Sequence, residues 1–115
     1  MLVVEPGKHP YVAAIENRMQ ALHRAVGGWI EVISLDEESL IIANDESKLI
    51  GLPGNRRLEN DILAGTFLIV GRQGDAFTSL SEENQVYYAN VFWEPEEITP
   101  EEVQETMRCD VIFFK

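Results

Sequence analysis

The residues best suited to recognise a ligand lie in the glycine- and proline-rich segment from Gly51 to Arg57. Its turn-forming residues predict a loop. Glycine lets the backbone approach a ligand closely and leaves amide N–H groups free to donate hydrogen bonds. The two consecutive arginines carry planar guanidinium groups that suit phosphate or carboxylate oxygens. We therefore predict a site for a small phosphate-bearing ligand, formed by Gly54, Asn55, Arg56, Arg57, Lys8 and Tyr11.

The same segment is also typical of an ordinary surface loop. In that interpretation its arginines pair with Glu59, Asp61 or carboxylates of the C-terminal half. The Gly-x-x-x-x-Gly-Lys pattern of a phosphate-binding loop is absent from the sequence. Sequence alone leaves both interpretations open.

Acidic side chains are unevenly distributed and offer a second chemistry. The 115 residues carry a formal net charge of −11, and residues 59–115 hold 12 acidic but 3 basic side chains. Such a chain repels the backbone of DNA and RNA, so direct nucleic-acid binding is not expected. The surplus predicts either a solvated face or a surface that imitates a phosphate backbone toward a basic protein partner. The candidate contacts are Glu94, Glu96, Glu97, Glu101, Glu102 and Glu105.

No catalytic or cofactor-binding pattern accompanies these residues. His9 and His23 are the only histidines, and neither has partners at metal-ligand spacing. No serine occupies a Gly-x-Ser-x-Gly turn. Carboxylates are plentiful, but their spacing does not identify a general acid and base. We therefore expect a non-enzymatic protein without a metal or cofactor.

Hydropathy and cysteine content favour a cytoplasmic protein. No apolar run approaches the ~20 residues that cross a bilayer, so no membrane contact is expected. The apolar run at residues 1–4 is too short for the core of a signal peptide. The single Cys109 fits a reducing compartment and a buried structural role.

Three helices are expected along the chain. Apolar residues at steps of three and four from Val12 to Val26 predict a helix that begins near Pro10 and ends at Gly27. Ser81 begins a second helix. The segment Thr99–Glu102 forms a capping box for a third, short one.

Aromatic residues crowd the second helix. Tyr87, Tyr88, Phe92 and Trp93 cannot all face inward, because neighbouring positions on a helix diverge by about 100°. We expect the helix to bury a combination of Val86, Ala89 or Asn90, and Trp93. Exposed aromatic rings would then predict a homo-oligomer.

Strands are expected over residues 1–5, 29–35, 40–42, 62–70 and 109–114. The second and third form a hairpin across the turn at 36–39. The run 62–70 predicts one central strand buried on both sides. These elements predict a single α+β domain over residues 1–115, with a mostly antiparallel sheet of about five strands and two or three helices packed on one face.

Five segments combine into a family pattern: Glu5–Tyr11, Val26–Glu31, Asn44–Arg56, Asp61–Gly71 and Phe77–Leu80. In this combination the chain resembles domain of unknown function family 3846, small proteins of bacteria, phages and mobile elements. The resemblance covers about residues 1–93 and leaves 94–115 as an acidic extension. It implies no activity, but it implies an accessory protein of a phage or mobile element acting in the bacterial cytoplasm.

That context sharpens both functional hypotheses. In the first, the chain sequesters a nucleotide-type immune signal of the host through its arginine-containing segment. In the second, its acidic surface inhibits a defence enzyme by occupying that enzyme's nucleic-acid site.

Overall fold

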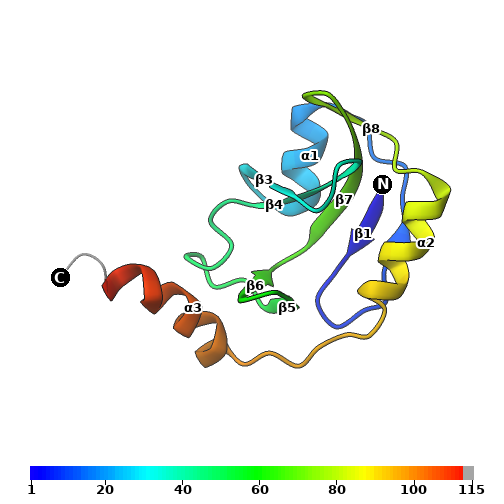
Figure 1. The fold of residues 1–115 in the computed structure, drawn as a ribbon. Helices are drawn as coiled ribbons and strands as arrows, with labels where there is room; N and C mark the ends of the chain where they lie inside the picture. Colours follow the sequence, from blue (N-terminus) through cyan, green and yellow to red (C-terminus); the bar gives the residue numbers. More distant parts are fainter. Residues whose placement is uncertain (113–115) are drawn as a thin grey trace.

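The computed structural model describes the backbone of residues 1–112 and the side chains of residues 1–106. In chain order the elements are β1 (Leu2–Val4), β2 (Tyr11–Val12), α1 (Met19–Val26), β3 (Ile30–Ser34), β4 (Ser39–Asn44), β5 (Gly54–Leu58), β6 (Asp61–Ala64), β7 (Phe67–Gln73), β8 (Ala76–Thr78), α2 (Glu82–Val91) and α3 (Pro100–Ile112) (Figure 1). Helix α3 projects from one end of the molecule, beside the β5–β6 hairpin (Figure 1). Within the described residues, none of these helices has the length and hydropathy to cross a lipid bilayer.

The main sheet is antiparallel throughout and has the strand order β2-β1-β7-β4-β3, with β8 paired to the end of β7. Strands β5 and β6 form a separate two-stranded hairpin. Strand β7 is central, because Ile69 pairs with Leu2 of β1 on one side and Ile41 of β4 on the other. The predicted α+β class, the antiparallel sheet and the hairpin of β3 and β4 are confirmed.

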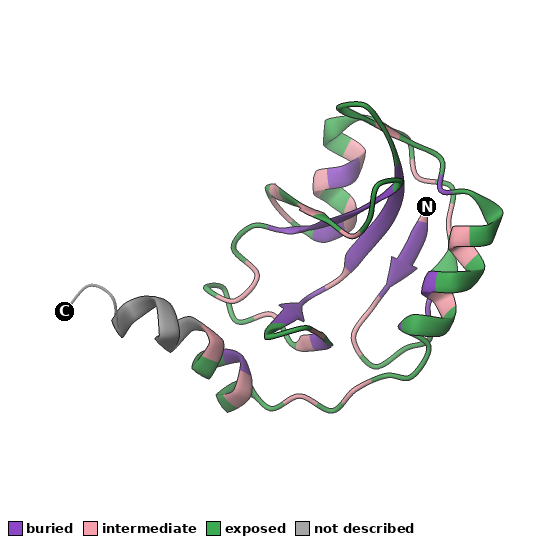
Figure 2. Cartoon of the chain, in the orientation of Figure 1, coloured by how far each residue is buried: buried purple, intermediate pink, exposed green. Residues whose placement is uncertain are grey.

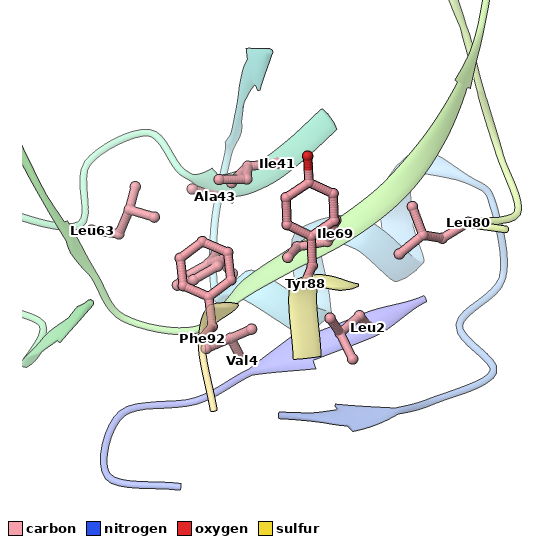
Figure 3. Packing of buried hydrophobic residues seen from close by; sticks show 10 residues of the cluster. Leu2, Val4, Ile41, Ala43, Leu63, Ile69, Leu80, Tyr88 and Phe92 are labelled. Atoms are coloured by element: carbon pink, nitrogen blue, oxygen red, sulfur yellow. The ribbon is translucent and has the colours of Figure 1, made fainter. Parts of the chain in front are cut away.

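Both faces of the sheet are buried, because its central strands carry apolar residues at consecutive positions (Figure 2). One face packs under Tyr88 of α2 and under Phe92, the residue that caps the end of this helix (Figure 3). The opposite face packs under Leu22 and Val26 of α1. The prediction that the helices share one face is therefore wrong: α1 and α2 cover opposite faces.

Helix α1 is shorter than its apolar pattern predicts. Its end at Gly27 is confirmed, with φ +82° and a hydrogen bond of 2.8 Å to the His23 carbonyl. Its predicted start near Pro10 is wrong, because Val12 lies in β2 and pairs with Leu2. Residues 11 and 12 pair with β1, and these backbone hydrogen bonds replace those that the first turn of the expected helix would have made.

The apolar run from residue 62 to 70 forms two strands rather than one. Gly65 separates β6 from β7 with φ +74°, a left-handed conformation that favours glycine. A Cβ at this position would also lie 2.7 Å from Leu52 Cδ1. The second half of the run, β7, is the doubly buried central strand that was expected.

Helix α2 begins as predicted but turns different side chains inward. Ser81 Oγ accepts a hydrogen bond of 3.2 Å from the Asn84 amide. The buried residues are Tyr88 and Phe92, one turn apart, while Val86 and Trp93 are exposed. The expectation that Val86 and Trp93 are buried is wrong, because the two large rings at positions 88 and 92 fill that face of the sheet (Figure 3).

Helix α3 confirms the predicted capping box. The Glu102 amide donates to Thr99 Oγ1 at 3.2 Å, and the Thr99 amide donates to Glu102 Oε1 at 3.2 Å. The helix is not short, since it continues to Ile112. The predicted strand at 109–114 is therefore wrong as far as Ile112, and its last two residues lie outside the described part of the chain. A helix satisfies its own backbone, whereas a strand here would need a neighbouring sheet edge.

Candidate functional site

The predicted arginine loop is largely a strand, and a bulge decides which of its side chains point inward. β5 pairs with β6, and the register shifts between Gly54 and Arg56, so that Asn55 is the extra residue. Such a bulge breaks strict alternation of side chains. Both Asn55 and Arg56 are consequently buried, and Arg57 is exposed on the opposite side of the strand. The loop prediction is wrong from Gly54 to Arg57.

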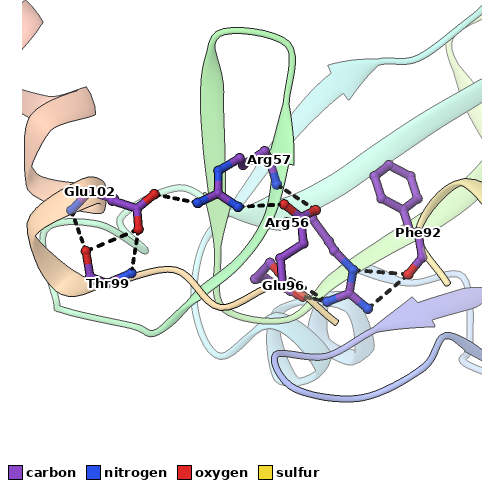
Figure 4. A network of polar contacts seen from close by, with 7 residues as sticks. Arg56, Arg57, Phe92, Glu96, Thr99 and Glu102 are labelled. Atoms are coloured by element: carbon purple, nitrogen blue, oxygen red, sulfur yellow. Dashed lines mark hydrogen bonds and ion pairs between the residues drawn. The ribbon is translucent and has the colours of Figure 1, made fainter. Parts of the chain in front are cut away.

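Arg56 is a buried internal brace. Its side chain is 1% exposed, and its guanidinium makes five hydrogen bonds, all to uncharged oxygens. Figure 4 shows the two to the Phe92 carbonyl. Nε and Nη2 donate to the Phe92 carbonyl at 3.0 and 2.9 Å, and Nη2 also donates to the Lys8 carbonyl at 2.7 Å. Nη1 donates to the backbone and side-chain oxygens of Asn55. Arg56 thereby joins the end of α2 to the loop after β1, and its burial lowers the pKa of the guanidinium.

Asn55 is engaged in the same way. Its Nδ2 donates to the Val4 carbonyl at 2.9 Å and to the Gly65 carbonyl at 2.8 Å. Val4 is the last residue of β1 and Gly65 directly follows β6, so the amide holds the hairpin against the main sheet. The hydrogen-bond donors of the Asn55 and Arg56 side chains are therefore engaged by oxygens of the chain itself.

Arg57 faces the acidic C-terminal extension. Its Nη1 donates to Glu96 Oε1 at 2.9 Å, and its Nη2 donates to Glu102 Oε2 at 2.5 Å (Figure 4). The Arg57 amide also donates to Glu96 Oε2 at 3.2 Å. The hydrogen bond to Glu102, and to a smaller extent the one to Glu96, raises the pKa of Arg57. This arrangement matches the second interpretation of the sequence, in which an arginine pairs with carboxylates of the C-terminal half.

An apolar contact completes the docking of the extension on β5. Ile98 and Val103 pack over Gly54, where an added Cβ would lie 2.6 Å from Ile98 Cγ2. Glycine at position 54 therefore permits the close approach of the extension. The predicted ligand residue Gly54 is covered by the chain itself.

The side chains of Lys8 and Tyr11 contact Glu5 rather than the other predicted ligand residues. The Lys8 side chain is exposed and lies 4.0 Å from Glu5, while its carbonyl receives Arg56. Tyr11 lies on the edge strand β2, half exposed, and a hydrogen bond with Glu5 raises its pKa. The predicted phosphate site is thus not assembled as a cluster of free donors in the described residues.

A different feature emerges beside the hairpin: two adjoining cavities of about 430 Å³ and 570 Å³. Lys48, Asp61 and Ile62 line both cavities, so they form one depression that we call the acidic groove. Its carboxylates are Glu31, Asp45, Glu46, Glu59, Asp61, Glu102 and Glu105. Its cationic side chains are Lys48 and Arg57.

The cationic side chains of the groove are already paired. Lys48 forms an ion pair with Asp61, and Arg57 is held by Glu96 and Glu102. Burial is the main cause that raises the pKa of Glu31, and the negative charges of Asp45 and Asp61 raise it further. The groove therefore presents crowded negative charge. Within the described residues, its carboxylates do not form a three-ligand cluster suited to a metal ion.

The acidic residues that the sequence predicted are divided between two roles. Glu102 and Glu105 line the groove, and Glu102 also holds Arg57 together with Glu96. Glu94, Glu97 and Glu101 are exposed outside the groove lining. Sequence reasoning missed the contribution of Glu31, Asp45 and Glu46, since they come from the less acidic half of the chain. The turn at 44–47 was visible, but its proximity to the hairpin was not.

The four aromatic residues in α2 and directly after it divide into a buried pair and an exposed pair, as their spacing requires. Tyr88 and Phe92 are buried, whereas Tyr87 and Trp93 are exposed. The His9 ring stacks on Trp93 with ring centroids 4.2 Å apart. Tyr88 donates a hydrogen bond to Asp36, and burial together with this carboxylate raises the pKa of Tyr88 to about 12.

Comparison with known proteins identifies the family. The family model described as Domain of unknown function (DUF3846) matches residues 1–93. The chain belongs to this family. No curated protein and no solved structure matches the chain. The matched residues of this DUF3846 protein include the β5–β6 hairpin and the arginines, while the segment that holds Arg57 begins just after residue 93.

Proposed function

We propose that this DUF3846 protein is a non-enzymatic binding protein whose acidic groove receives a basic segment of a partner protein. The observation that carries the proposal is convergence: seven carboxylates from four parts of the chain line one depression beside two cations that are already paired. Depressions lined by one sign of charge focus the electric field and speed association with oppositely charged partners.

The groove offers contact chemistry as well as charge. Leu49, Ile62 and Leu63 line it beside the carboxylates, so a lysine or arginine stem has apolar surface to cover. Burial raises the pKa of Glu31, and repulsion from the Asp45 and Asp61 carboxylates adds to this effect. A bound cation would relieve this repulsion and strengthen binding as Glu31 becomes fully charged.

Sequestration of a phosphate-bearing ligand is the other function that the sequence suggested, and it has less support. The donors of Asn55 and Arg56 are engaged by backbone and side-chain oxygens of the chain. A phosphate at Arg57 would have to displace two carboxylates. The groove beside it would repel the incoming anion.

The phage or mobile-element context implied by the family resemblance favours one class of basic partner. A host defence enzyme that binds nucleic acid presents a basic cleft, and an acidic groove fits a basic segment at the rim of such a cleft. In this proposal the protein acts in the bacterial cytoplasm as an inhibitor by occupancy.

A fluorescence anisotropy titration with a labelled octalysine peptide tests the proposal. We expect binding that weakens steeply between 50 and 300 mM salt, because the screening length of exposed charges falls from about 14 Å to about 6 Å over this range. The triple variant Glu31→Gln, Asp45→Asn and Glu105→Gln should weaken binding about tenfold or more. Among the described residues, the side chains at these three positions take part in no ion pair, so the substitutions should leave the fold intact.

A charge-matched variant supplies the control. Glu37→Gln, Glu82→Gln and Glu83→Gln remove the same charge from exposed positions outside the groove lining. Equal weakening in both triple variants would mean that net charge alone attracts the peptide, and the proposal would fail. Tighter binding of a labelled nucleotide than of octalysine would instead favour the sequestration function.

A further inference from the structure

The sheet has one long free edge, and it borders the acidic groove. In the strand order β2-β1-β7-β4-β3, strand β3 is terminal and pairs with β4 over five residues. The opposite edge, β2, has two residues. We propose that the basic partner segment binds as an added β-strand along β3, a mode that rests on the proposed function of the groove.

The backbone groups available at this edge follow from the β3–β4 ladder. The Asp45 amide donates to the Trp29 carbonyl at 2.8 Å, and the Leu35 amide donates to the Ser39 carbonyl at 3.0 Å. Because hydrogen-bonded and non-hydrogen-bonded pairs alternate in an antiparallel ladder, residues 29, 31, 33 and 35 direct their backbone groups toward β4. Ile30, Val32 and Ser34 therefore direct their N–H and C=O groups outward, as a template for another strand.

Side chains along β3 specify the chemistry of that strand. Glu31 lines the acidic groove, on the face of the sheet that α2 covers. Val32 pairs with Ile42 on the opposite face and is 46% exposed. Because successive side chains of a strand point to opposite faces, a matching partner carries lysine or arginine at every second position and apolar β-branched residues between them.

Charge argues against a second copy of this chain as the occupant. Two β3 strands side by side would bring two acidic grooves together, with Glu31 of each copy near the other. Glu31 is the one charged residue of this edge strand; the β3–β4 ladder has no register shift and β3 contains no proline, so its backbone stays open to a strand of opposite charge. A positively charged strand satisfies the outward backbone groups and the groove at once.

Amide hydrogen exchange, read by NMR, tests this binding mode. The probe is a nine-residue peptide that alternates lysine and valine, compared with a peptide of the same composition in which lysines and valines are grouped. We expect the alternating peptide to slow exchange of the Ile30, Val32 and Ser34 amides by about tenfold or more at saturation. The grouped peptide should bind at least about tenfold more weakly, because fewer backbone hydrogen bonds and side-chain matches form together.

The variant Val32→Pro removes one outward donor while the β3–β4 hydrogen bonds stay intact. It should weaken binding of the alternating peptide about tenfold and leave the exchange of β4 amides unchanged. If the variant does not fold, exchange in the unaltered protein still decides the matter. Peptide binding that depends on groove carboxylates without protection of these amides would overturn the added strand and leave the proposed function standing. Absence of any peptide binding would overturn both.

Discussion

Two adjacent arginines of β5 occupy opposite environments. Arg56 is buried and held by five bonds to uncharged oxygens, whereas Arg57 is half exposed and held by two carboxylates of the C-terminal extension (Figure 4). The first connects elements within the family domain, and the second connects that domain to residues beyond it. Identical side chains one position apart thus serve folding in one case and docking in the other.

Accessibility, rather than residue type, decides what an arginine can recognise. A buried guanidinium with all its donors satisfied is a structural cross-link. An exposed one exchanges partners at little cost, since surface ion pairs contribute little net stability. The two positions should therefore respond differently to mutation, salt and pH.

The largest effect should come from Arg56→Ala. Loss of the guanidinium leaves the Phe92 and Lys8 carbonyls without their donor, and we expect the free energy of unfolding to fall by about 3–5 kcal/mol. Urea denaturation measures this change. Arg56→Lys keeps the charge but loses the planar fork, so it should recover part of the stability. A loss below about 1 kcal/mol for Arg56→Ala would break the comparison.

Gly54→Ala should have the next largest effect. The new Cβ would lie 2.6 Å from Ile98 Cγ2, so either the extension shifts or the strand is strained, at about 1–3 kcal/mol. Limited proteolysis should then cut residues 94–112 sooner. Adding Ile98→Ala removes the closest clashing atom and should restore part of the protection. Unchanged proteolysis in Gly54→Ala would show that the extension does not rest on this glycine.

Arg57→Ala should act on the extension and leave the global unfolding transition close to that of the parent protein. The side chain is exposed, and its partners Glu96 and Glu102 are released into solvent. We expect faster hydrogen exchange in α3, with the same effect in the parent protein at 1 M salt. A large drop in the urea midpoint would contradict the distinction between the two arginines.

Acid should release the extension before it disturbs Arg56. The Thr99 backbone amide, and then Arg57, lower the pKa of Glu102 in the folded chain. A lowered folded pKa means that this stabilisation is present above the unfolded value near 4.5 and is lost as pH falls through the folded value. The protection factors of the α3 amides, which correct for the slower intrinsic exchange in acid, should therefore fall below about pH 4.5. The acceptors of Arg56 do not titrate, so the Phe92 region should stay protected there.

Local signals made several elements predictable from the sequence. Gly27 ends α1, Ser81 caps α2 and Thr99 opens α3, because each residue acts on backbone groups within one turn. The β3–β4 hairpin was predictable for the same reason. Long-range contacts explain the failures: pairing of Val12 with Leu2 shortens α1.

The candidate site was less predictable, for physical reasons. Nothing local to Arg56 shows that the carbonyls of Lys8 and Phe92 will surround it, or that a bulge at Asn55 will turn it inward. The acidic surplus of the C-terminal half was visible, and it correctly indicated carboxylate partners for Arg57. Convergence of Glu31 with the hairpin and α3 needs the fold itself.

An NMR titration of the ¹⁵N-labelled protein with octalysine tests the central claim most directly, because it maps where a basic segment binds. If the groove is the binding site, the shifts will be concentrated there, in the amides of residues 31, 45–48, 59–62 and 102–105, with a saturable end point. Shifts spread evenly over other acidic positions such as Glu37, Glu82 and Glu83 would contradict that claim. In that case the negative charge would serve as a solvated surface and not as a binding site.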